Sequence, residues 1–105
     1  GDIGSAIQKY IETERLGVIR DLVGHGIGRD INEEPQVPNY GQPGQGLELV
    51  EGMVIAIEPM VVSGDWKIKE GSDGFVFQTK DGGLAAHFEH TIAITKKGPK
   101  ILTVL

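Results

Sequence analysis

The sequence contains no cysteine, and this absence excludes several kinds of chemistry. Without thiols there is no disulfide framework, no thiolate metal ligand and no cysteine nucleophile. A chain that does without disulfides suits a reducing compartment, so we expect a cytoplasmic protein. A serine nucleophile is not indicated either, because the string G-x-S-x-G is absent.

Long apolar runs and basic clusters are also missing. The longest apolar runs, such as residues 53–57, are far shorter than the about 20 residues that span a bilayer, and no basic-then-apolar leader opens the chain. We therefore expect a soluble protein with no membrane partner. The ten lysine and arginine residues are scattered among fifteen acidic ones, for a net charge of -5, so nothing indicates a nucleic-acid partner.

The length of 105 residues, of which 39% are hydrophobic, predicts a single domain over residues 1–105. The chain begins at Gly1 and not at a methionine, which suits a processed or excised chain. Sixteen glycines and five prolines are spread between apolar segments, a pattern that indicates short elements joined by tight turns.

Hydrophobic periodicity predicts one helix followed by several strands. Apolar residues recur at helical spacing over about residues 3–15, where Asp2 can cap the helix. Buried or alternating apolar patterns then predict strands over 18–23, 53–62, 66–70, 75–79, 85–95 and 101–105, with 66–70 and 75–79 forming a hairpin. This order is typical of an α+β protein, with an amphipathic N-terminal helix packed on an antiparallel sheet.

Two segments rich in glycine and proline are expected to lack regular structure. "GHGIG" (24–28) is interpreted as a loop or an irregular strand, and the prolines and glycines of residues 33–46 predict a long loop. The glycines do not indicate a dinucleotide site, because no helix follows whose N-terminus could hold a pyrophosphate. "HFE" (87–89) resembles part of a zinc deaminase motif, but the cysteine ligands of that site are absent.

Two glutamates lie inside apolar strand patterns, where a carboxylate is costly to bury without compensation. Alternation along residues 53–62 places Glu58 on the face of Val54 and Ala56, and Glu89 shares its face with Thr91. With His25 on the glycine-rich segment, these carboxylates form an N/O ligand set that suits Mn, Fe, Co or Zn. Pairing of both glutamates with lysine or arginine at sheet edges, with His25 packed against a turn, explains the same pattern, and composition and periodicity alone favour that explanation.

Four strings, in their order and intervals, resemble the second half of a type I methionine aminopeptidase: "GHGIGR", "NEEPQVPNYG", "GMVIAIEPM" and "FEHTIAIT". The resemblance covers nearly the whole chain. It implies one half of a pita-bread fold, with a curved antiparallel sheet and a dinuclear metal site. It also implies removal of the N-terminal methionine of nascent proteins, in the cytoplasm and near the ribosome.

The resemblance assigns a role to each candidate ligand. His25 and Glu58 match ligands of one ion, and Glu89 matches the carboxylate that bridges two ions. The implied reaction is hydrolysis, in which the metals lower the pKa of a water and Glu58 carries the proton. Two aspartate ligands of the family lie in a first half that this chain does not contain, so at most one ion is expected here and the chain alone is expected to be inactive.

The resemblance departs from the family pattern at the substrate pocket. Asn32 stands where the family has a histidine that contacts the substrate carbonyl. Asparagine donates hydrogen bonds but cannot be protonated, so a general-acid role is lost. Phe75 stands where a tryptophan is usual, and Ile31 is expected to line the same pocket.

Three hypotheses therefore stay open. The chain works as an enzyme with a separate or covalently linked N-terminal half, it folds as a non-catalytic half-domain that homodimerises over an apolar face, or it is a pseudoenzyme that binds without turnover.

Overall fold

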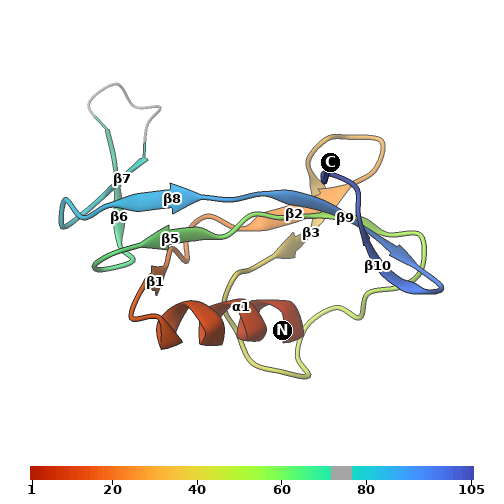
Figure 1. Cartoon of the computed structure of the whole chain (residues 1–105). Coiled ribbons are helices and arrows are strands. Elements are labelled where there is room, and N and C mark those ends of the chain that lie inside the picture. The colour runs from red at the N-terminus through yellow and green to blue at the C-terminus, as the bar shows by residue number, and fades with distance from the viewer. Residues whose placement is uncertain (72–76) are drawn as a thin grey trace.

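The computed structural model describes residues 1–71 and 77–105 and has the predicted α+β architecture (Figure 1). A single helix occurs in these residues, and it precedes ten short strands. Their bounds are α1 Asp2–Thr13, β1 Gly17–Val18, β2 Gly24–Ile27, β3 Glu33–Val37, β4 Val54–Ile57, β5 Met60–Val62, β6 Ile68–Glu70, β7 Phe77–Thr79, β8 Ala85–His87, β9 His90–Thr95 and β10 Gly98–Ile101. No helix of the described residues is long and apolar enough to cross a bilayer.

The strands form three antiparallel groups. The largest is a five-stranded sheet in the order β10–β9–β4–β2–β3, beside a three-stranded sheet β1–β5–β8 and the hairpin β6–β7. The chain leaves β4 for β5 through residues 58–59, and it leaves β8 for β9 through residues 88–89. Because β5 pairs with β8 and β4 pairs with β9, these two breaks lie side by side at the junction of the sheets (Figure 1).

The helix α1 covers one face of the five-stranded sheet. Val37, Ile55 and Ile92 form a buried cluster on that face, and Ile3 of α1 packs against it with Leu49, Ile57 and Ile94. The helix is predicted correctly to within two residues at its C-terminal end. Asp2 is its first residue instead of its cap, and the Asp2 carboxylate accepts a hydrogen bond of 2.7 Å from the Gly44 amide.

Of the two segments rich in glycine and proline, residues 24–27 form an irregular strand, which is one of the two expected alternatives, whereas the expected loop is wrong for residues 33–37. Residues 24–27 form the strand β2 between β3 and β4, with a register shift between His25 and Gly26. A Cβ at Gly24 would collide with the Ala56 carbonyl, so glycine permits the close approach of β4. Residues 33–37 form β3 despite Pro35, which an edge strand tolerates because half of its backbone donors need no partner.

The other strand predictions are confirmed in part. Residues 53–62 divide at Glu58 and Pro59 as expected, and residues 85–95 divide similarly at 88–89. The predicted strand over 18–23 reduces to Val18, and the last strand is residues 98–101 instead of 101–105. The hairpin β6–β7 is present, with residues 75 and 76 of the prediction outside the described residues.

Candidate metal centre

Strand register brings His25, Glu58 and Glu89 to one face of the five-stranded sheet. In β4, Ala56 pairs with His25 of β2 on one side and with Thr91 of β9 on the other. Directly paired residues of antiparallel strands point to the same face, and so do residues two apart in one strand. Glu58 lies two residues after Ala56 and Glu89 lies two before Thr91, so the three side chains converge across three strands.

This His25 face is opposite to the Ile55 face that α1 covers. Gly26 and Ile92 pair with Ile55, and they therefore belong to the face with the buried apolar cluster. The alternation predicted for Glu58 and Ala56 is thus seen in the sheet. Alternate residues of the same strands supply the core on one side and the candidate site on the other.

The converging side chains are close enough to share one cation. His25 Nε2 lies 3.3 Å from Glu58 Oε2, and both side chains are 16% exposed. One ligand atom from each of His25, Glu58 and Glu89 lies within 4.8 Å of the others, with Glu89 exposed. Two ligands each about 2.0–2.2 Å from an ion lie roughly 3–3.5 Å apart, so the separation of His25 and Glu58 fits a common ion.

The His25 ring is oriented by its own strand. Its Nδ1 lies 3.0 Å from the Gly26 carbonyl oxygen, which can only accept a hydrogen bond. Nδ1 therefore carries the proton, and in a neutral imidazole the lone pair is then on Nε2, the atom that faces Glu58. Metal-binding histidines usually have this arrangement, in which the second ring nitrogen donates to a carbonyl or carboxylate.

The Glu58 carboxyl is electrostatically unfavourable as an anion in the metal-free chain. Burial and the neighbouring charge of Glu89 raise its pKa above the ordinary value of 4.5, and His25 and His87 offset part of that rise. Opposite charge within a few ångströms would favour the ionised form. An imidazole nitrogen and two carboxylates that face one another therefore form a donor set that fits a divalent cation.

A small cavity of about 150 Å³ lies against the neighbouring sheet and hairpin. Met60 and His87, which pair in β5 and β8, line it, and they are two residues from Glu58 and Glu89 respectively. Its other lining residues are mostly apolar: Ile19, Ile68, Phe77, Gln78, Thr79, Ala85 and Ala86. An apolar hollow thus adjoins the strands that carry both carboxylates.

The predicted pocket residues are not part of this cluster. Ile31 and Asn32 lie in the turn between β2 and β3, where both are exposed and Ile31 has 84% of its surface accessible. Phe75 lies outside the described residues. The roles assigned to these three residues stay predictions.

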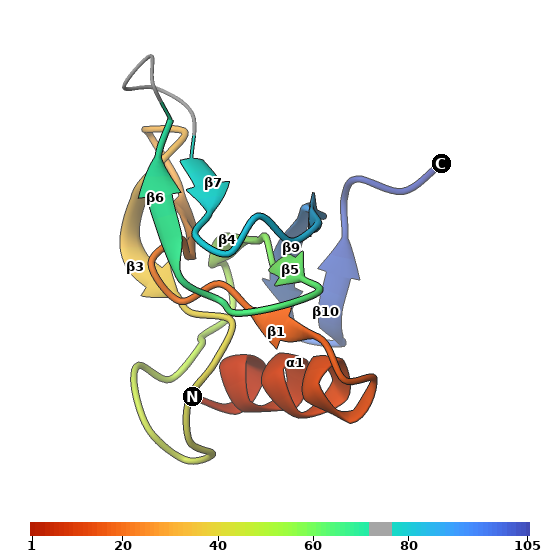
Figure 2. The ribbon, with the colours of Figure 1, turned by 90° about the vertical axis from the view of Figure 1, so that its left-hand side faces the viewer.

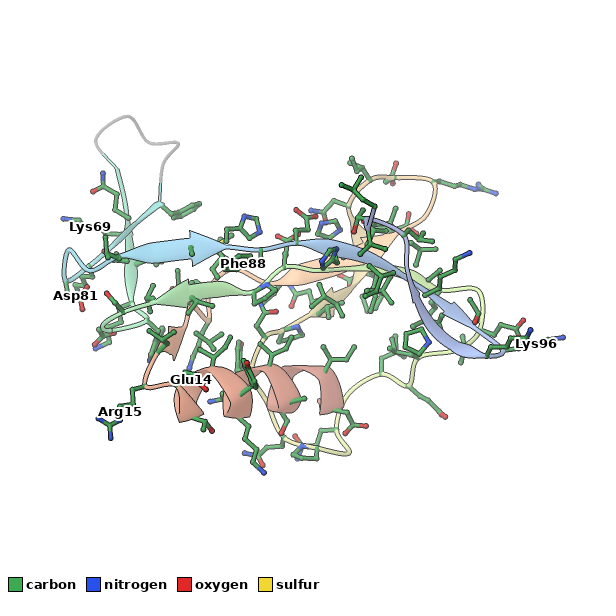
Figure 3. All side chains as sticks on the ribbon, in the orientation of Figure 1. Glu14, Arg15, Lys69, Asp81, Phe88 and Lys96 are labelled. Carbon is green, nitrogen blue, oxygen red and sulfur yellow. The ribbon has the colours of Figure 1, made fainter. Side chains whose placement is uncertain are left out.

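His87 is a neighbour of Glu58 to which the sequence analysis gave no role. Its charge acts on Glu58, because β8 pairs with β5 just beyond the break at Pro59. Alternation along residues 85–95 already places His87 on the face of Glu89 in the sequence. Figure 3 labels Phe88, which lies between them at the junction of β8 and β9 and is 64% exposed.

Comparison with known proteins identifies the family. The sequence pattern of metallopeptidase family M24 matches residues 1–96. The chain belongs to this metallopeptidase family. It is 54% identical over 103 residues to a methionine aminopeptidase of Clostridium acetobutylicum, covering 98% of this chain and 41% of that relative. It is 52% identical over 102 residues to methionine aminopeptidase 1 of Bacillus subtilis, covering 97% of this chain and 41% of the relative.

Solved structures agree with this assignment. A methionine aminopeptidase from Thermotoga maritima superposes with a TM-score of 0.97 and 52% identity, over 100% of this M24 chain and 42% of the other. The enzyme from Rickettsia prowazekii gives a TM-score of 0.95 and 47% identity, over 99% and 42% respectively. The M24 chain is therefore a fragment of a pita-bread fold, and it spans about two fifths of the length of the relatives that it matches.

Proposed function

We propose that this chain is the part of a type I methionine aminopeptidase that supplies His25, Glu58 and Glu89 to a metal centre. In the complete enzyme this centre holds two divalent ions, chosen among Mn, Fe, Co and Zn, and the substrate is the N-terminal methionine of a nascent protein or peptide in the cytoplasm. The observation that carries the proposal is the convergence of the three side chains within 4.8 Å from separate strands. The chain alone holds at most one ion and does not turn over.

The bound metal would polarise the scissile carbonyl and lower the pKa of a water molecule. His25, Glu58 and Asn32 each have a separate role in the proposed reaction. His25 is fixed by the contact of Nδ1 with Gly26 and presents Nε2. Glu58, whose pKa is raised, accepts a proton on a carboxylate oxygen and passes it to the departing amine. Asn32 donates a hydrogen bond to the substrate carbonyl but transfers no proton.

The shape of the chain supports a missing partner segment. The Cα radius of gyration is 14.5 Å, whereas about 13 Å is usual for a compact domain of roughly 100 residues. In the described residues the only helix packs on the Ile55 face, so Glu89 on the opposite face is exposed. We infer that residues 1–105 fold as one unit and that the other part of the enzyme covers the His25 face.

A chimera tests this function. The matched 41% of the Clostridium acetobutylicum relative is replaced by this chain, and hydrolysis of Met-Ala-Ser is assayed with Mn²⁺ or Co²⁺. We expect turnover, and we expect Glu58→Gln to lower kcat by about 10²-fold or more because proton transfer and a ligand are lost. Glu51→Gln, an exposed carboxylate outside the cluster, is the matched control. Equal loss in both variants would contradict the assignment of Glu58.

Asn32 favours a second candidate, a pseudoenzyme that keeps the fold for binding. A folded chimera without turnover, in which Asn32→His restores none, would support that function. Restoration by Asn32→His would instead show a competent centre with one altered position. Sedimentation of the 105-residue chain tests the homodimer hypothesis. A strict monomer would exclude a second copy of the chain as the partner that covers the His25 face.

A further inference from the structure

Asn39 is the only polar residue that is buried among those the structure describes, with 0% of its surface exposed. It lies two residues after the end of β3, and the motif analysis of the sequence gives it no role. Burying an amide is unfavourable unless its donors and acceptors are paired. Its contacts therefore indicate why a polar side chain occupies this position.

Among the protein atoms of residues 1–71 and 77–105, the amide has a single hydrogen-bond partner. Its Nδ2 donates to the main-chain carbonyl oxygen of Glu58 over 3.4 Å, and its Oδ1 has no partner in these residues. The opposite amide orientation would place two acceptors against each other, so the donor must face Glu58. At 3.4 Å this contact is longer than the usual 2.7–3.2 Å, so its contribution to the stability of the fold is small.

The carbonyl that Asn39 contacts lies where strand pairing gives little support. Glu58 and Pro59 occupy the break between β4 and β5, and Pro59 has no N–H to donate. The direction of the Glu58 carboxylate depends on the main chain at this break. The Asn39 amide, which belongs to neither strand, therefore donates a hydrogen bond to the main chain of Glu58, the residue whose side chain lies near His25 and Glu89.

Asn39 is itself held by α1. A Cβ at Gly4 would collide with the carbonyl oxygen of Tyr40, so the helix lies directly against the segment 38–40. The Gly41 amide donates to Gln8 Oε1 over 3.2 Å, and the chain beyond it passes the start of the helix (Figure 2). The first turn after β3 is therefore fixed on both sides of Asn39.

Stability alone does not explain this side chain. An apolar residue of similar size would leave no orphaned Oδ1, and a half-satisfied buried amide is worse for stability than an apolar side chain. We propose that Asn39 is a positioning residue, whose amide fixes the Glu58 main chain so that the Glu58 carboxylate points at His25 and Glu89. The metal-binding part of this inference rests on the proposed function, and the geometric part does not.

The first test uses the metal-free 105-residue chain and two variants, Asn39→Leu, which keeps the size, and Asn39→Ala, which removes the donor without adding methyl groups. NMR measures the cross-peaks between the carbon-bound protons of the Glu58 side chain and those of the His25 ring, which flank the Nε2 and Oε2 atoms that lie 3.3 Å apart. We expect them to weaken or vanish in both variants, while contacts between paired Ile55 and Ile92 persist. Cross-peaks of unchanged intensity overturn the proposal, and so does loss of the Ile55–Ile92 contacts in both variants.

The second test is calorimetric titration with Co²⁺. Loss of a residue that orients a metal ligand typically weakens binding, and we expect about a tenfold loss for Asn39→Leu relative to the unsubstituted chain. Unchanged Co²⁺ affinity in both variants counts against Asn39 as a positioning residue. If the unsubstituted chain binds no Co²⁺, the proposed metal centre fails for this chain, and the NMR result still decides the role of Asn39.

Discussion

The two faces of the five-stranded sheet are built from alternate residues of the same strands, yet they have opposite character. On the Ile55 face, Ile55 and Ile92 are 1% and 8% exposed and pack beneath α1. On the His25 face, Ala56 and Thr91 are flanked by a histidine and two carboxylates, and His25 and His87 offset only part of the rise in the Glu58 pKa. One face is packed beneath the helix, and the other presents a group of ligands that could hold a cation.

The residues that stabilise the fold therefore lie on the Ile55 face, and the candidate metal ligands lie on the His25 face. The energy of the fold comes from apolar burial beneath the helix, which is proportional to the area removed from water. The His25 face contributes little of that energy, because a buried carboxylate beside another one is unfavourable in the absence of a metal. Substitutions on the two faces should therefore affect different measurements.

The largest effect on stability is expected for Ile55→Ala. Removing buried methyl and methylene groups leaves a cavity, and comparable substitutions cost about 2–5 kcal/mol of unfolding free energy. Urea denaturation of the chain measures it. The matched control is Phe88→Ala at the sheet junction, which is 64% exposed and should change stability by about 0.5 kcal/mol or less. Similar losses of unfolding free energy in both variants would contradict the view that residues beneath α1 stabilise the fold more than exposed ones.

The next effect concerns metal affinity and not stability. Glu89→Gln keeps the size of the side chain but removes a charged ligand, so Co²⁺ or Mn²⁺ binding to the chain should weaken by about tenfold or more. Calorimetry gives the affinity and the number of ions, for which one is expected. Glu51→Gln is the control, because Glu51 is an exposed carboxylate outside the cluster. An equal change in both would mean that the ion binds nonspecifically to acidic residues.

Much of this contrast was predictable from the sequence, for identifiable reasons. Alternation in "VIAIEPM" places Glu58 on the face of Ala56, and Pro59 ends the strand, because both depend on local backbone geometry. The convergence of His25 with both glutamates was not predictable from spacing, since 33 and 31 residues separate them along the chain. It followed from the resemblance of four motifs to a family, and in the structure it follows from strand register.

Local propensity alone does not account for β2 or for Asn39, because long-range contacts decide both. Glycine disfavours strands, yet Gly24 and Gly26 belong to β2 because neighbouring backbones approach too closely for a side chain. Asn39 had no signal in the sequence, because its burial depends on the helix that packs over the segment after β3. Local sequence patterns therefore predict which residues are buried and which face of a strand they share. Strand pairing and the contacts of Asn39 depend on the tertiary fold.

A smaller effect is expected from the pH dependence of Glu58. Its pKa is raised on folding, so its contribution to stability is most favourable below the unfolded value near 4.5 and is lost as pH rises through the folded value. Glu58→Gln should therefore stabilise the metal-free chain at pH 7 by less than about 1 kcal/mol, since solvent screens a partly exposed group. Thermal midpoints between pH 4 and 8 measure this, and a destabilised variant at pH 7 would contradict it.

The smallest effect is expected at Asp81, a carboxylate whose environment is opposite to that of Glu58. Asp81 is labelled at the hairpin end of the molecule in Figure 3, where its oxygens accept hydrogen bonds from the Asp65 amide at 2.7 Å and the Gly83 amide at 2.8 Å. These donors lower its pKa below 3.8, so its stabilising contribution is present above pH 3.8 and is lost as pH falls through the lowered value.

Asp81→Asn should therefore lower the thermal midpoint slightly at neutral pH, because one amide donor then faces an NH₂ group. The difference from the unsubstituted chain should shrink below pH 3.8, whereas the difference caused by Glu58→Gln should shrink as pH falls toward 4.5 and have the opposite sign. Two carboxylates in one small chain would thus respond oppositely to the same titration, because burial and the charge of Glu89 raise the pKa of Glu58, whereas backbone donors lower the pKa of Asp81. Responses of equal sign would show that net charge, and not the local partners, governs both.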